Sequence, residues 1–381
     1  MIVNRKHKIL VVIPSLRIRS GVVAHVMNYY KNINDRFEID FIVYSEENNL
    51  NTETIKKNGG KIFYFEKNFL KCFVAMNNFF ANHKDEYDIV HCHTFNYGLP
   101  CLVYAKKYGV KCRIIHMHNP KFSDSFIKNI LNYFLFKACV KTSNVYVACS
   151  EQTGQKMFGK RSFTIVKNAI DLSGFTDEDR EQTRNELGIK NDVCVFGNVG
   201  RLVDQKNQIF ALEVFRELKN SKKYKTSKLL LIGTGPKLHD IKNYISEHNL
   251  TEDFIYIQSA TNMAKYYAAM DCFIFPSKYE GLGITLIEAQ AAGLPCFCSD
   301  KLPKEAFATN GAKRVALSDG VKGWSKIILC SDLSKRNNRQ QLVEAGFDIE
   351  SESAKLVNFY HRILQKEYAP RIDKCNQERR A

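Results

Sequence analysis

The sequence predicts an α/β protein of two doubly wound domains, each a parallel sheet with helices on both faces. Apolar runs typical of strands alternate with helical patterns along most of the chain. These runs are continuous rather than alternating, which is typical of strands buried on both faces. With 381 residues, the chain is also longer than one hydrophobic core usually supports. We therefore expect two domains.

The first half of the chain carries the first series of strands and helices. Helical patterns lie at about residues 21–32, 68–83 and 125–141 and separate apolar runs in the order expected of βαβ units. The predicted strands are KILVVIP (8–14), EIDFIVYS (38–45), KIFYFE (61–66), DIVHCHT (88–94), KCRIIHMHN (111–119), NVYVACS (144–150) and FTIVKNAID (163–171).

A polar stretch without strand signal, residues 171–192, precedes the second series. Its predicted strands are DVCVFGNVG (192–200), SKLLLIGTG (227–235), FIYIQS (254–259), CFIFPS (272–277) and LPCFCSD (294–300), with helices at about 207–220, 236–248, 263–270 and 284–293. The expected domains are 1–175 and 192–354, with a linker over 176–191 and a helix with a charged tail over 355–381.

The composition narrows the class of protein. With 45% hydrophobic and 25% charged residues, the chain cannot be disordered, collagenous or mostly coiled coil. No run reaches the roughly 18 uncharged apolar residues that span a bilayer, so we predict no transmembrane helix. The twelve cysteines form no CxxC pair and lie mostly in apolar runs. Reduced, buried thiols of this kind indicate a cytoplasmic protein.

The net charge of +16 is concentrated in residues 101–150, which hold eight basic residues and one acidic residue, Asp124. Within this segment, residues 125–141 combine a nearly continuous apolar surface with lysines. An anionic membrane surface is one partner that this pattern fits. The alternative is a core helix with a few solvated lysines. Nucleic acid is not expected, because no binding motif accompanies the charge.

Two strand-to-helix connections carry features suited to an anion. Gly21 follows the first strand at a predicted helix start, where backbone amides favour negative charge, although a plain capping turn is the more frequent explanation of a glycine there. The connection GNVGRLVDQKN supplies Arg201 and Lys206 just before a helix. Two such cations suit a diphosphate. The alternative is a solvated basic loop.

The sharpest motif is PSKYEGLGITLIEAQAAGLP, residues 276–295. Glu280 lies in a glycine-bearing loop after a strand, and Glu288 follows eight positions later in the helix that this loop opens. Gly281 and Gly283 allow the backbone at the helix N-terminus to approach a ligand. Because Glu288 stands in an otherwise apolar helix, its carboxylate needs a partner. Ribose hydroxyls or a basic neighbour would serve.

Two His-x-His pairs, His91/His93 and His116/His118, lie at strand ends of the first domain. Alternate residues of a strand share a face, so a zinc site is conceivable. The pairs stand on different strands without a carboxylate cluster, and we therefore predict structural histidines, with His118 the candidate to face the cleft. The chain also lacks a P-loop, a complete dinucleotide fingerprint and an Asp-x-Asp pair outside the polar stretch.

Together these motifs resemble the retaining glycosyltransferases of family four, which have the GT-B architecture of two Rossmann-like domains facing across a cleft. NAID, EAQAAGLP and HMHN resemble most the branch that builds capsular, exopolysaccharide and lipopolysaccharide chains in bacteria. The fold it resembles implies that the C-terminal helix packs back on the first domain. The resemblance covers residues 8 to about 300, and its elements are SGVVAHVMN, DIVHCHT, IIHMHN, VYVACS, VKNAID, FGNVGRLVDQKN, LLLIGTGP and YEGLGITLIEAQAAGLPCFCSD.

The resemblance implies roles for the residues that match. Arg201 and Lys206 would neutralise the donor diphosphate as the leaving nucleotide gains charge, and Gly21 would line the diphosphate and acceptor side. Glu288 would hold the ribose hydroxyls. The donor sugar would be oriented by Glu280, Gly281, Leu282 and Gly283, and His118 would face the sugar near the reacting carbon. The predicted catalytic residues are then His118 and Glu280, and the family requires no metal or other cofactor.

The sequence departs from the family pattern at three places. Ala169 replaces the usual glycine of the Asn-Gly-Ile-Asp element, and Gly21 stands alone where a glycine pair is common. The glycine and arginine often found after the strand at 254–259 are absent from QSATNMAKYY. The first of these matches the branch named above. The others affect acceptor contacts and the choice of nucleotide.

The resemblance leads to one functional prediction with two alternatives. We expect a retaining, metal-independent glycosyltransferase, peripheral at the inner face of the membrane, that moves a sugar from a nucleotide-sugar, more often UDP-linked, to a lipid-linked precursor of a bacterial surface polysaccharide. A nucleotide-sugar epimerase or sugar-phosphate synthase would share the fold. A non-catalytic nucleotide-sugar-binding partner in an assembly complex would bind without turnover.

Overall fold

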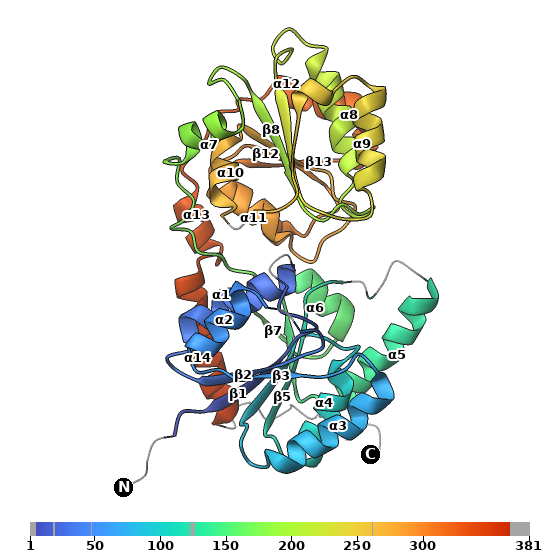
Figure 1. Ribbon diagram of the computed structural model, residues 1–381, viewed down its shortest axis with the longest axis vertical. Coiled ribbons are helices and arrows are strands. Elements are labelled where there is room, and N and C mark those ends of the chain that lie inside the picture. Colours follow the sequence, from blue (N-terminus) through green and yellow to red (C-terminus); the bar gives the residue numbers. More distant parts are fainter. Residues whose placement is uncertain are drawn as a thin grey trace, which may run out of the picture. The chain divides into compact units, whose positions relative to one another are not determined.

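The computed structural model describes residues 5–17, 20–46, 48–120, 122, 126–260 and 262–365, without the side chains of 126–128. The chain forms two compact units (Figure 1). Unit 1 comprises Met1–Ala169 and Ile349–Ala381, and unit 2 comprises Ile170–Asp348. The charged tail predicted after the last helix begins beyond Gln365 and lies outside the described residues.

Unit 1 is built on a parallel sheet in the order β3-β2-β1-β4-β5-β6-β7. The order reverses between β1 and β4, which is the point where doubly wound sheets bind ligands. The strands are β1 (Lys8–Val12), β2 (Glu38–Val43), β3 (Ile62–Tyr64), β4 (Ile89–Cys92), β5 (Cys112–Met117), β6 (Val145–Ala148) and β7 (Thr164–Ile165).

Helices cover both faces of this sheet. One face packs against α1, α2 and α14, and the other packs against α3 to α6. The helices are α1 (Gly21–Ile33), α2 (Leu50–Lys57), α3 (Phe69–Asn82), α4 (Gly98–Lys107), α5 (Phe126–Thr142), α6 (Glu151–Phe158) and α14 (Ile349–Leu364).

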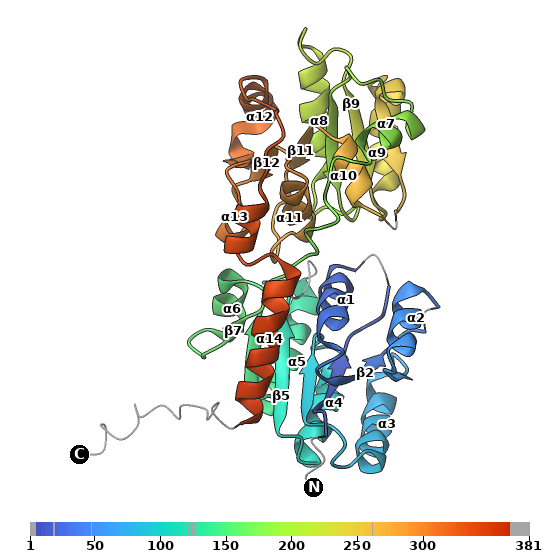
Figure 2. The ribbon, with the colours of Figure 1, turned by 90° about the vertical axis from the view of Figure 1, so that its left-hand side faces the viewer.

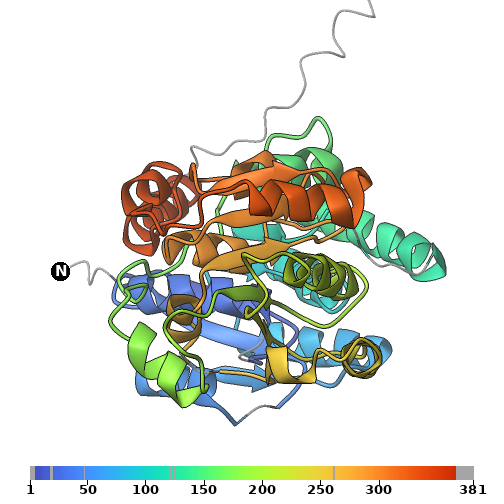
Figure 3. The ribbon, with the colours of Figure 1, turned by 90° about the horizontal axis from the view of Figure 1, so that it is seen from above.

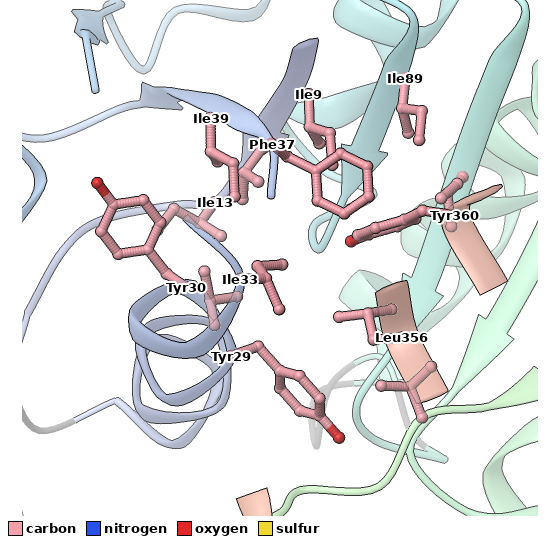
Figure 4. Packing of buried hydrophobic residues seen from close by; sticks show 14 of the residues in the cluster. Ile9, Ile13, Tyr29, Tyr30, Ile33, Phe37, Ile39, Ile89, Leu356 and Tyr360 are labelled. Atoms are coloured by element: carbon pink, nitrogen blue, oxygen red, sulfur yellow. The ribbon is translucent and has the colours of Figure 1, made fainter. Parts of the chain in front are cut away.

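The C-terminal helix α14 belongs to unit 1, where it lies beside α1 (Figure 2). Figure 4 shows the core between them: Ile33 of α1 and Leu356 and Tyr360 of α14 converge on strand residues. The Phe37 and Tyr360 rings meet edge to face, 5.4 Å apart. Apolar burial of this extent ties the last helix to the first sheet.

Unit 2 repeats the arrangement with the parallel order β10-β9-β8-β11-β12-β13. The core on one face includes α8, α9 and α12, and that on the other includes α10, α11 and α13, so helices lie on both sides of the strands (Figure 3). The strands are β8 (Val195–Val199), β9 (Lys228–Ile232), β10 (Phe254–Ile257), β11 (Cys272–Phe275), β12 (Cys296–Ser299) and β13 (Ala312–Val315). The helices are α7 (Arg180–Glu186), α8 (Gln208–Lys219), α9 (Leu238–Glu247), α10 (Ala264–Ala269), α11 (Ile284–Ala291), α12 (Gly320–Leu329) and α13 (Arg339–Glu344).

The unit boundaries differ from the predicted ones. The first falls after Ala169 rather than 175, and the last before Ile349 rather than 355. The predicted linker 176–191 is part of unit 2, because it contains α7, whose Arg184 is buried and binds Asp271 through its guanidinium at 2.5 Å. A buried arginine on a short polar helix leaves no apolar pattern in the sequence, and for that reason the segment resembled a linker.

Helix α5 is partly buried and partly exposed. Its C-terminal half is core, with Phe136, Cys139 and Val140 buried. Earlier in the helix, Leu131 and Phe134 are 60% and 65% exposed. Within the described helices, none is both long and apolar enough to cross a bilayer.

Candidate active site

The carboxyl ends of β8 and β9 in unit 2 are joined backbone to backbone. Gly200 N donates to Ile232 O at 3.0 Å, and Leu202 N donates to Thr234 O at 2.8 Å. Gly233 has φ +150°, and a Cβ there would lie 1.9 Å from Gly200 O. Only glycine permits this approach, so GTG at 233–235 serves loop packing. The packing fixes the start of the connection that carries Arg201 and Lys206.

Lys206 is held inside this connection. Its ammonium Nζ lies 2.7 Å from Glu280 Oε1, with the two side chains 12% and 8% exposed. The contact is an ion pair without hydrogen-bond geometry, since Oε1 has no hydrogen-bond partner among the described residues. Nζ also stands 4.7 Å from the centre of the Phe275 ring. The Lys206 ammonium is therefore a largely desolvated cation that the Glu280 carboxylate and the Phe275 ring both stabilise.

The loop that follows β11 is fastened to the loop that follows β8. Gln205 Nε2 donates to Tyr279 O at 2.9 Å, and Lys278 N donates to Gln205 O at 2.8 Å. Asn207 Nδ2 donates to Pro276 O at 3.3 Å. Gln205 is buried, so these bonds are shielded from solvent. The two loops that carry the predicted donor residues therefore form one rigid edge of unit 2.

Helix α11 begins at this edge. Gly283 precedes it with φ +84°, a conformation that favours glycine, and a Cβ there would lie 3.3 Å from Phe275 Cε1. Leu282 is 1% exposed and anchors the loop in the core. The first-turn N–H groups of a helix lack intrahelical acceptors and attract anions. The predicted loop 281–283 is thus placed where a polar ligand can meet the helix start.

Glu288 lies on α11 and is bound by a residue that the sequence did not single out. Tyr267 Oη donates to Glu288 Oε2 at 2.8 Å and stands 3.2 Å from Thr285 O. Burial raises the pKa of Glu288 to about 7, while the Tyr267 hydrogen bond and the Lys206 charge oppose this rise. The carboxyl group is therefore close to half ionised at neutral pH.

Arg201 differs from Lys206. Its side chain is exposed, and in the part of the chain that the structure describes its guanidinium has neither a hydrogen bond nor an ion pair. Its backbone carbonyl accepts from Gln208 Nε2 at 2.8 Å, which fixes the main chain only. An exposed guanidinium on a rigid main chain can turn toward an anionic ligand at little cost.

Several buried polar atoms near this edge lack partners among the described residues. They are Asn198 Oδ1 in β8, Ser277 Oγ after β11 and Thr285 Oγ1 in α11. Native proteins rarely leave such atoms unsatisfied. Their concentration at one end of the sheet indicates a site for a hydroxyl-rich, anionic ligand.

The two remaining predicted residues, His118 and Gly21, lie in unit 1. Gly21 begins α1, where Ser20 gives no side-chain cap and a Cβ on Gly21 would meet no atom within 4 Å. No tight turn there requires glycine, so close approach of a ligand remains the prediction for it.

His118 belongs to a histidine cluster at the ends of β4 and β5. His93 Nδ1 and His118 Nε2 are 2.8 Å apart, and His91 Nε2 and His116 Nδ1 are 3.2 Å apart. The cluster gains His25 from α1, which the sequence analysis missed because it stands in an ordinary amphipathic helix. Burial lowers the pKa of His91 and His118 to about 3, and those of His25, His93 and His116 well below their ordinary value. All five imidazoles are neutral at physiological pH.

Two family models divide the chain between them. Residues 19–173 match the model described as Glycosyltransferase Family 4, and residues 179–348 match Glycosyl transferases group 1. The chain belongs to the family-four glycosyltransferases. The resemblance predicted from its motifs and the GT-B fold are confirmed, and so is the prediction of a glycosyltransferase.

Curated relatives extend over most of the chain. It is 28% identical to EpsF of Bacillus subtilis (strain 168) over 370 residues, 92% of this chain and 95% of EpsF. It is 25% identical over 294 residues to the UDP-Gal:alpha-D-GlcNAc-diphosphoundecaprenol alpha-1,3-galactosyltransferase of Escherichia coli, 73% of this chain and 76% of that enzyme.

Solved structures share the fold of this glycosyltransferase. A glycosyltransferase from Rickettsia africae ESF-5 has a TM-score of 0.73 at 17% identity, covering 94% of this chain and 99% of that one. HepE of Anabaena, solved with UDP-glucose, has a TM-score of 0.72 at 15% identity with the same coverage. At these identities the likeness concerns the fold alone.

Proposed function

We propose that this glycosyltransferase moves a sugar from a nucleotide-sugar to a lipid-linked precursor of a bacterial surface polysaccharide. The donor we expect first is a UDP-sugar. The transfer retains the anomeric configuration and uses no metal. The observation that carries the donor side is the largely shielded group of Lys206, Glu280 and Glu288 at one sheet edge, with unpartnered polar atoms nearby. The E. coli galactosyltransferase, whose name gives a GlcNAc-diphosphoundecaprenol acceptor, supports the acceptor class.

The proposed donor contacts follow from charge and position. Arg201 closes on the diphosphate from solvent, while Lys206 gives a fixed positive charge that stabilises the leaving nucleotide. Gly21 lines the diphosphate and acceptor side. The Glu288 carboxylate, oriented by the hydrogen bond from Tyr267, accepts hydrogen bonds from the ribose hydroxyls.

The donor sugar lies against the loop at the start of α11. Glu280 and the backbone of 281–283 orient its hydroxyls, and His118 faces the reacting carbon. A neutral His118 suits this place, because a cation there would oppose an oxocarbenium-like transition state. The acceptor hydroxyl attacks from the face that the nucleotide leaves, and its proton passes to the departing phosphate.

A binding titration tests the donor site. Arg201→Ala should weaken nucleotide-sugar binding by about 10 to 100 fold, the worth of a charge-assisted hydrogen bond. Arg216→Ala is the matched control, because Arg216 is an exposed arginine of unit 2 that contacts His248. Equal affinity of both variants and the wild type would refute the donor site. Binding without turnover on any acceptor would support the non-catalytic alternative.

We further propose that unit 1 docks on an anionic membrane through its α3–α5 face, which comprises Leu70 and Val74 of α3 and Ile130, Leu131 and Phe134 of α5. These side chains are 46% to 78% exposed, and α4 contacts both helices. The lysines of the face are exposed as well, among them Lys71, Lys106, Lys107 and Lys137. Exposed apolar groups with exposed lysines on the same and the intervening helices fit a bilayer of anionic lipid.

Vesicle sedimentation tests this face. The double variant Leu131→Glu/Phe134→Glu should lose about 10-fold or more of its binding to phosphatidylglycerol vesicles. Leu50→Glu is the control, because Leu50 of α2 is 60% exposed and its helix packs on the other sheet face. Equal binding by the two variants would contradict the proposal, as would binding that ignores lipid charge.

A further inference from the structure

The histidine cluster of unit 1 contains ring nitrogens that its hydrogen bonds do not use. Among the described residues, His25 Nδ1, His116 Nε2 and His118 Nδ1 are buried and lack a hydrogen-bond partner. His25 comes from α1, whereas His116 lies in β5 and His118 directly follows that strand. Three unsatisfied buried nitrogens in one place call for an unseen partner.

One set of tautomers explains the hydrogen bonds and leaves two of these nitrogens, His116 Nε2 and His118 Nδ1, as lone pairs. His91 Nδ1 lies 2.7 Å from Tyr360 Oη, so it can donate there and let His91 Nε2 accept from His116 Nδ1–H. His116 Nε2 then carries a lone pair. If His118 Nε2–H donates to His93 Nδ1, then His118 Nδ1 also carries a lone pair. Imidazoles oriented by a second hydrogen bond are typical of metal ligands.

The spacing also suits an ion. One ring nitrogen each of His25, His93, His116 and His118 lies within 4.8 Å of those of the others. Four-coordinate zinc with Zn–N bonds of 2.0–2.1 Å needs nitrogens about 3.4 Å apart, so the rings must close by about 1 Å. A cavity of about 30 Å³, lined in part by His25, His91 and His93, gives the His25 ring room to turn.

Within the described residues the cluster holds no carboxylate. A dication therefore favours an open position with water or hydroxide, whose pKa on a three-imidazole zinc is about 7. The Asn168 amide, close to His25, has an unpartnered Oδ1 that could accept from it.

We propose that His25, His116 and His118 form a three-imidazole site for a Zn²⁺-class ion. One of the two sequence arguments against a metal, beside the missing carboxylate cluster, was that the histidine pairs stand on different strands. β4 and β5 are neighbours in register, which places His93 beside His116 and removes that objection. The ion is not part of the proposed transfer. Because it would occupy the His118 nitrogen, Zn²⁺ is expected to inhibit, and this consequence alone rests on the proposed function.

Metal titration of the full, tag-free chain tests the site directly. Zn²⁺ in competition with a chromophoric chelator should show one ion per chain, and Co²⁺ should give the visible spectrum of a four-coordinate ion. His25→Gln and His116→Gln should each weaken binding by about 100-fold. His239→Gln, which changes an exposed histidine of α9, should bind as the wild type.

The outcomes separate a built site from surface binding. Zn²⁺ that binds both cluster variants with wild-type affinity, or no binding by the wild type, would overturn the proposal. Melting curves without metal identify a variant that fails to fold. If both fail, the wild-type Co²⁺ spectrum decides, because a six-coordinate spectrum contradicts a buried imidazole site. If Zn²⁺ binds the wild type but does not inhibit sugar transfer, the result would count against the role of His118 in transfer and would still support the metal site.

Discussion

Replacing Tyr267 by phenylalanine isolates how the fold prepares Glu288 for its ligand. Tyr267 is fully buried and donates to the Glu288 carboxyl at 2.8 Å. A hydrogen bond to a charged group is worth about 1.5–3 kcal/mol, and one pKa unit corresponds to about 1.4 kcal/mol. Tyr267→Phe should therefore raise the pKa of Glu288 from about 7 by a further ~1 to 2 units.

The expected consequence is a shifted pH profile of donor binding. At pH 7.5 the ionised fraction of Glu288 should fall from about three quarters to about a quarter or less. An ionised carboxylate accepts from both ribose hydroxyls, so the midpoint of nucleotide-sugar affinity against pH should move up by about 1 to 2 units. At pH 9.5 the variant should approach wild-type affinity, which a merely damaged site would not do.

Calorimetric titrations between pH 6 and 9.5 make the comparison. Tyr224→Phe is the control, because it removes a buried hydroxyl on the other side of the sheet that has no partner among the described residues. An unchanged midpoint in Tyr267→Phe would refute the reasoning. So would a midpoint near pH 7 that persists in Glu288→Gln.

Three further results are expected. The folded pKa of Glu288 lies above its ordinary value of 4.5, so the free energy of unfolding declines as the pH rises from about 4.5 to about 7. Glu288→Gln should therefore stabilise the protein by about 3 kcal/mol at pH 8, seen as a higher Tm, and should have no effect at pH 4.5. Lys206→Met leaves the buried Glu280 carboxylate unpaired and should lower the free energy of unfolding in urea by about 3 kcal/mol. The double variant Lys206→Met/Glu280→Gln should recover most of this loss. Additive losses would contradict the pairing. Transfer should survive dialysis against EDTA, and a fall of 10-fold or more would exclude a metal-free reaction.

The sequence predicted the fold because its signals are local. Continuous apolar strands such as KILVVIP and CFIFPS can be buried only in a covered parallel sheet, and the structure contains them as β1 and β11. Edge elements are different. β13 has the sequence AKRV with its middle residues exposed, so it carries no apolar run and was not predicted.

The candidate site was predictable only where motif and chemistry coincide. Glu280 and Glu288 stood out as acidic residues in an apolar context, and the structure places them beside Lys206 and Tyr267 respectively. Tyr267 and His25 left no signal, because a tyrosine or histidine in an amphipathic helix is ordinary until the fold shows what it faces. Their contacts join residues from separate helices and strands, which no local pattern encodes.

Transfer of labelled sugar is the most direct test of the central claim. The chain would be incubated with a membrane lipid extract and, in turn, with UDP-, GDP- and ADP-linked radioactive sugars, and the label would be counted in the organic phase. The account predicts label from one donor class in the lipid fraction, without added metal and abolished in Glu280→Gln. Label that stays in water for every donor, or lipid label that Glu280→Gln leaves unchanged, would contradict it.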